Sequence, residues 1–137
     1  MSYAVSTTVD QPYAEVVPRV RAALAEQGFG ILTEIDVAAT LKEKLDVDVG
    51  PWLILGACNP PLAHAALQAE PSIGLLLPCN VVVRAAENGG TVVEAVDPQT
   101  LVRLTGNPRL HQVADDAGRR LSAALDSLPY GADPGTG

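Results

Sequence analysis

The segment Trp52–Cys58 reads WLILGAC, and it decides the fold because so unbroken an apolar run is typical of a covered strand. Such a strand lies under helices on both faces or at the centre of a sheet. Asn59 follows as a favoured N-cap residue, and Pro60 suits the first position of a helix. We therefore expect a helix from Pro60 to about Glu70, and a strand that leads at once into a helix predicts a mixed α and β fold.

The chain before this segment predicts two more strands and two more helices. The strands are expected over Tyr3–Val9 and Gly30–Asp36, with a helix from about Pro12 to Gly28 and a short helix over Val37–Leu45. Pro18 falls inside the first helix and predicts a kink or a first turn that is not fully helical. Asp36 is expected to cap the short helix.

The chain after Glu70 predicts a β-hairpin and a long amphipathic helix. The hairpin joins Val81–Ala86 to Thr91–Val96 through a turn at residues 88–90, and the last helix runs from Asn107 to Leu128. The apolar run Ile73–Leu77, together with Val81–Val83, could pack beside Trp52–Ala57. Gln99–Leu104 is too short for its pattern to distinguish a helical turn from a strand.

These elements predict one α+β domain over residues 1–128 and a disordered tail over residues 129–137, which is rich in Gly and Pro. The formal net charge of −7 repels phosphate backbones and anionic membrane surfaces, so nucleic acid is not an expected partner. The sequence has no apolar run near the ~20 residues of a membrane span, and its first residues do not resemble a signal peptide. We expect a cytoplasmic protein that does not enter the membrane.

Motifs of the familiar enzyme classes are absent from the sequence. Gly28-Phe29-Gly30 follows a helix and precedes a strand, the reverse of the order found in nucleotide-binding turns. Glu34 and Asp36 could act as paired carboxylates on one strand face, but solvated or capping roles are favoured. The charged residues 115–120 of the last helix are expected to form a solvated face with paired charges.

Two cysteines make the strongest candidate site. Cys58 ends the apolar strand just before a helix start, where unpaired amides and the helix dipole favour a thiolate. Cys79, between Pro78 and Asn80, would enter the neighbouring strand, so both thiols could meet at one end of the sheet. The candidate ligand-binding residues are Cys58, Asn59, Cys79, Asn80, His64 and Trp52, with Cys58 and Cys79 as candidate catalytic residues.

The residues leave several uses of this site open. Cys58, Cys79 and His64 could hold a soft metal, although this set is one ligand short of a tetrahedral zinc site. A disulfide between the cysteines would be reversible at most in a reducing compartment. Both cysteines could instead be inert core residues, and His64 on an Ala- and Leu-rich helix is more simply a hydrogen-bonded or partly exposed histidine than a ligand.

Three separated segments resemble the family called domain of unknown function 302. They are Gly28–Asp36, Leu55–Pro60 and Leu77–Val81, in that order, and the likeness covers Tyr3 to Leu128. The resemblance implies a curved, mainly antiparallel sheet packed by helices, as in the TATA-binding-protein-like architecture, and a homodimer. It implies no DNA binding. Ala38 stands where relatives often carry Lys, so a role of that basic group is not expected here.

Three functions from different classes are compatible with these observations. The first is a homodimeric module that binds a small ligand or soft metal in an apolar pocket lined by Cys58, Cys79, Trp52, Leu77 and His64. The second is a thiol redox or sulfur-transfer enzyme with Cys58 as nucleophile and Cys79 as resolving thiol. The third is a structural or interaction domain with inert cysteines. The sequence identifies no cofactor and no substrate.

Overall fold

A computed structural model describes residues 3–129 and contains five strands and five α-helices in this range. The strands are β1 (Ala4–Val9), β2 (Gly30–Asp36), β3 (Trp52–Cys58), β4 (Cys79–Ala85) and β5 (Thr91–Val96). The α-helices are α1 (Tyr13–Glu26), α2 (Val37–Leu45), α3 (Pro60–Ala69), α4 (Gln99–Thr105) and α5 (His111–Asp126). Short 3-10 helices η1 (Pro71–Leu76) and η2 (Pro108–Leu110) precede β4 and α5.

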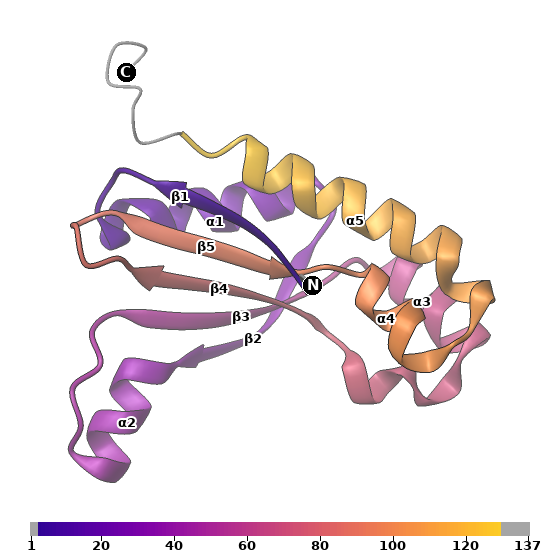
Figure 1. The fold of residues 1–137 in the computed structure, drawn as a ribbon, viewed down its shortest axis with the longest axis horizontal. Helices are drawn as coiled ribbons and strands as arrows, with labels where there is room; N and C mark the ends of the chain where they lie inside the picture. The colour runs from indigo at the N-terminus through magenta and orange to yellow at the C-terminus, as the bar shows by residue number, and fades with distance from the viewer. Residues whose placement is uncertain (1–2, 130–137) are drawn as a thin grey trace.

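The strands form one open antiparallel sheet in the order β1-β5-β4-β3-β2 (Figure 1). The α+β class and the antiparallel sheet are confirmed, as are the hairpin and the bounds expected for β2, α2 and β3. The centre of the sheet is β4 rather than β3, because β3 lies between β4 and the edge strand β2. Among the described residues no helix is long and apolar enough to span a membrane.

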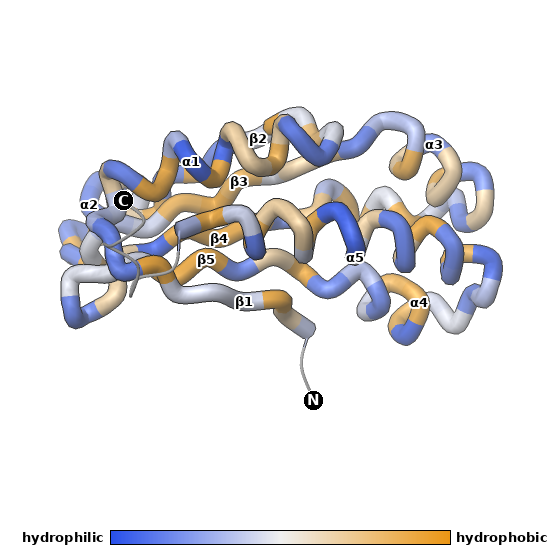
Figure 2. Tube along the Cα trace, turned by 90° about the horizontal axis from the view of Figure 1, so that it is seen from above, coloured by the Kyte–Doolittle hydropathy of each residue, from blue (hydrophilic) through white to orange (hydrophobic). Residues whose placement is uncertain are grey.

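One face of the sheet is covered by α1 and α5, which pack against each other and on the strands. Inward side chains of the strands, such as Leu55, Val81 and Val93, meet Leu24 of α1 and Leu121 of α5 in the main hydrophobic cluster. Apolar and polar residues alternate turn by turn along α5 (Figure 2), which is the pattern of a helix with one buried face. Helix α1 runs through Pro18 without interruption.

A second, smaller hydrophobic cluster lies beyond the ends of the strands, where α3, α4 and η1 gather (Figure 1). Its buried members are Ala66, Ile73, Leu101 and Leu110. The expectation that Ile73–Leu77 packs beside β3 was wrong, because this stretch forms η1 and buries Ile73 in the second cluster. The undecided segment Gln99–Leu104 is helical, and α4 buries Leu101 in the same cluster.

The acidic residues of β2 have structural partners. Asp36 accepts a hydrogen bond from the backbone N–H of Ala39 at 2.9 Å and so caps α2. Glu34 forms an ion pair with Arg21 of α1. On α5, Asp116 pairs with Arg119 at 3.1 Å and with Arg120 at 3.0 Å. These contacts confirm the capping and surface-pairing roles expected from the sequence.

The face of the sheet that α1 and α5 do not cover carries both apolar and charged side chains. Ile35, Ile54 and Val82 lie opposite one another across β2, β3 and β4. The same row continues as Glu94, which pairs with Arg84 at 3.4 Å on this face. Helix α2 buries none of its residues and stands clear of α1 and α5 (Figure 1). The expected tail lies outside the described residues from residue 130 onward.

We predict that Gly56→Ala destabilises the fold by about 1–3 kcal/mol, the usual cost of overpacking. A Cβ at Gly56 would lie 2.1 Å from Thr33 Oγ1 and 2.7 Å from Pro78 Cγ, closer than real atoms approach.

Gly118→Ala is the control, because its Cβ would meet only Pro98 Cδ at 3.9 Å. Removing this glycine from a helix should stabilise by about 0.5–1 kcal/mol. Urea unfolding of both variants measures the two effects, and equal stability of Gly56→Ala and the wild type would contradict the prediction.

Candidate functional site

The candidate site begins where the chain leaves the sheet at the end of β3. Asn59 is 9% exposed, and its side-chain oxygen accepts a hydrogen bond from the Leu62 N–H at 3.3 Å, as expected of an N-cap residue. The amide nitrogen of Asn59 faces Gly28, where an added Cβ would lie 2.9 Å away. The start of α3 therefore lies close against the turn after α1.

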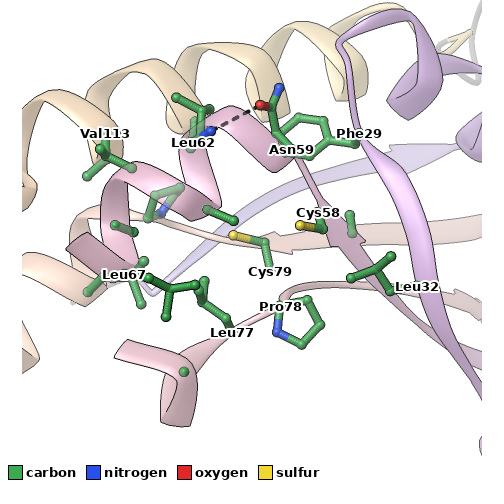
Figure 3. Close-up of a pocket in the computed structure, with 18 residues that line it drawn as sticks. Phe29, Leu32, Cys58, Asn59, Leu62, Leu67, Leu77, Pro78, Cys79 and Val113 are labelled. Atoms are coloured by element: carbon green, nitrogen blue, oxygen red, sulfur yellow. Dashed lines mark hydrogen bonds between the residues drawn. The ribbon is translucent and has the colours of Figure 1, made fainter. Parts of the chain in front are cut away.

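A cavity of about 310 Å³ lies between this junction and the helices beyond the strand ends (Figure 3). It separates the main hydrophobic cluster, which supplies Phe29 and Ala57, from the second cluster, which supplies Ala66 and Leu101. Its lining comes from the ends of β2, β3 and β4 and from three helices. The full lining is Phe29, Leu32, Ala57, Cys58, Asn59, Leu62, Ala63, Ala66, Leu67, Gly74, Leu77, Pro78, Cys79, Pro98, Leu101, Val113, Ala114 and Ala117.

The chemistry of this lining is almost entirely apolar. Among its described residues, the amide of Asn59 and the thiols of Cys58 and Cys79 are the side chains with polar or sulfur atoms, and none is charged. Alanines on two facing helices, including Ala63 of α3 and Ala114 of α5, leave the space open. A charge placed here would lose its hydration without gaining a partner, which is costly. The cavity therefore suits an uncharged group.

Both cysteines line the cavity as free thiols (Figure 3). In the strand register Cys79 lies opposite Ala57, and Cys58 follows Ala57 by one residue. The two cysteines are therefore not paired across β3 and β4, and the structure does not show the meeting of the two thiols that the sequence suggested. Burial raises the pKa of the Cys79 thiol to about 11, and Cys58 adds to this effect. Cys79 is therefore a neutral thiol near pH 7, whereas Cys58 is half-buried.

Three of the candidate residues lie elsewhere. Trp52 begins β3, six residues before Cys58, which is about 20 Å along an extended strand. Asn80 is exposed and points to the opposite sheet face from Cys79. His64 is exposed on α3 and does not line the cavity. Within residues 3–129 no group of three or more His, Cys, Asp or Glu side chains could hold a metal ion, so the structure does not bring Cys58, Cys79 and His64 together as a set of ligands.

Sequence reasoning found Cys58, Asn59, Leu77 and Cys79 but missed most of the lining. Phe29 and Leu32 come from the β2 end, and Val113, Ala114 and Ala117 come from α5. The α5 residues belong to the apolar stripe that was assigned to the core, since a stripe does not reveal which of its members face a cavity. The one signal in the sequence was that Ala114 and Ala117 are small residues at helical spacing, which leave space beside the helix.

Comparison with known proteins gives a family and a fold. The family model described as "Domain of unknown function DUF302" matches residues 5–128. The chain is similar to the solved structure of an uncharacterized conserved DUF302 protein from Bacillus stearothermophilus, with 34% identity and a TM-score of 0.84. The alignment covers 92% of this chain and 98% of that one. No protein with a curated description matches.

The raised pKa of Cys79 predicts a loss of stability at high pH. A thiol with a pKa of about 11 in the folded state and an ordinary value of 9.0 stabilises the fold below pH 9. This contribution falls as the pH rises toward the folded value, by a total of ~3 kcal/mol at about 1.4 kcal/mol per pH unit. Urea unfolding at a series of pH values should show a steeper loss for the wild type than for Cys79→Ala. All other titratable groups are the same in the two proteins, so parallel curves would contradict the prediction.

Proposed function

The chain belongs to the DUF302 family, whose description records no activity, and we propose that it binds an uncharged apolar small molecule in the cavity beneath α3. The observation that carries this proposal is the apolar lining of a cavity of about 310 Å³. That volume is at the lower end of the ~300–1,000 Å³ typical of ligand pockets. Cys58, Asn59 and Cys79 are the ligand-binding residues of the proposed site.

The cysteines contribute to this site as polarizable walls. A neutral thiol packs like a small hydrophobic side chain, and Cys79 is 8% exposed. A resolving thiol must become a thiolate to exchange, and the raised pKa of Cys79 opposes this at neutral pH. The thiol redox or sulfur-transfer function therefore has less support than binding. The proposed location is the cytoplasm, where two free thiols are stable.

We also propose that the protein is a homodimer that packs through the uncovered face of the sheet. Antiparallel sheets usually present polar residues on a solvated face. Here Ile35 and Trp52 are 49% and 37% exposed. Ile54 lies opposite Ile35, and Val82 continues this apolar row onto β4. A second copy is a suitable partner, because the charges on this face, Arg84 and Glu94, already neutralise each other. Two copies could then pack without burying an unpaired charge.

The binding proposal predicts that N-phenyl-1-naphthylamine, a neutral apolar dye, becomes fluorescent when it enters the cavity. Ala63→Phe should lower the affinity by at least tenfold, because the ring would fill space that the Ala63 methyl group borders. Ala22→Phe, at an exposed position of α1, is the matched control and should bind as the wild type does. A fluorescence titration gives the dissociation constants. Equal binding by the wild type and Ala63→Phe, with both folded by circular dichroism, would place the dye elsewhere and contradict the proposal.

The dimer proposal predicts that Trp52→Glu shifts the protein toward the monomer, because it places a charge in an apolar interface. Tyr3→Glu is the control, since Tyr3 is an aromatic residue that is 72% exposed. It comes just before β1, the edge strand farthest from β2. Sedimentation velocity at micromolar concentration reports the mass of each variant. A monomeric wild type, or a Trp52→Glu variant that stays dimeric, would refute this interface.

A further inference from the structure

We infer that the ligand of the cavity is a single straight alkyl chain, which enters tail first and leaves its polar head at the protein surface. This inference rests on the proposed binding function and names the chemical class of the ligand. It follows from the size of the cavity, the composition and extent of its walls, and the side chains at its mouth. Each of these observations favours a flexible chain over a compact or charged molecule.

The size of the cavity sets the length of chain that it can hold. A volume of about 310 Å³ accommodates about ten methylene-sized groups if each takes the ~30 Å³ of a water molecule in the liquid. A saturated chain of eight to ten carbons, roughly, would fill it. Filling matters because each buried methylene stabilises the complex by about 0.8 kcal/mol. The affinity should therefore depend on chain length up to this limit.

The walls are aliphatic and extended. Phe29 is the one aromatic side chain in the lining, so the contacts that the walls offer are mainly aliphatic. Figure 3 shows Phe29 and Leu32 toward one end of the lining, with Leu67 and Val113 toward the other. The space between them runs below α3, past both cysteines. An aliphatic lining contributed by several elements favours a flexible chain that can adapt to it.

The mouth of the cavity is rimmed by exposed leucines. Leu32 and Leu67 line the cavity although they are 67% and 42% exposed. Leu75, 87% exposed, follows the lining residue Gly74. Leu32 of β2 and Leu67 of α3 thus carry the apolar lining to the surface from two different elements. A chain can therefore leave the cavity along apolar surface while its head reaches water.

The charge of the protein favours an uncharged polar head group on the alkyl chain over an anionic one. None of the described lining residues is cationic, so the cavity offers no partner for a carboxylate. The net charge of −7 repels an anionic head as it approaches the rim. An alcohol head has neither disadvantage. We expect an n-alkanol to bind more tightly than the n-alkanoate of equal length.

The test is calorimetric titration of the full chain with n-alkanols from n-butanol to n-dodecanol. The affinity should rise about fourfold for each added methylene, the equivalent of ~0.8 kcal/mol, and level off near ten carbons. Ala63→Phe should abolish the rise, whereas Ala22→Phe should preserve it. n-Decanoate should bind more weakly than n-decanol. An affinity that does not change with chain length, or tighter binding of the decanoate, would overturn the inference.

The rim is tested with two leucines of equal exposure. Leu32→Ser should lower the affinity for both n-decanol and n-dodecanol, because the carbons next to the head of a chain that leaves its head at the surface pass the rim. Leu104→Ser is the matched control, as Leu104 is also 67% exposed but is not part of the lining. If the dye binds in an Ala63-dependent manner and no alkanol binds, the alkyl chain is wrong and the binding function stands. If neither binds, both proposals fail.

Discussion

The hydrogen bond between the Leu62 N–H and the side chain of Asn59 holds the junction on which the rest of the site depends. Asn59 is the single residue between the end of β3 and the start of α3, so the chain leaves the sheet abruptly. The amide of the same side chain packs against Gly28, and Arg120 of α5 donates to the backbone oxygen of Gln27 at 3.1 Å beside it. The end of α1, the start of α3 and Arg120 of α5 thus meet near the end of β3, through these two hydrogen bonds and the packing of Asn59 on Gly28.

This junction explains why the apolar interior is divided. With α3 directed away from the sheet, Ala66 and Leu101 cannot reach the main cluster and form a second one with Ile73. The alanines that face each other between the clusters are too small to close the gap. A space of about 310 Å³, partly open to the surface, therefore remains between the two clusters. Its apolar lining favours occupation by an apolar ligand.

The cysteines show how the environment decides the chemistry of a residue type. Next to a helix start, a thiol can become a reactive thiolate, and this was the expectation for Cys58. Cys79 lies instead among apolar side chains, which favour its neutral form. The family description supplies no activity to choose between these chemistries, so the argument for binding depends on the geometry of the site.

The sequence by itself determined the local structure. The run Trp52–Cys58, the caps at Asp36 and Asn59 and the hairpin turn are specified by nearby residues, and all were confirmed. Only the tertiary structure decided which strand is central, that Ile73 serves a second cluster, and that Trp52 and His64 lie outside the cavity. The physical reason is that an apolar pattern requires burial but does not specify the partner. The partners depend on long-range packing, which brings Phe29, Cys79 and Val113 around one space.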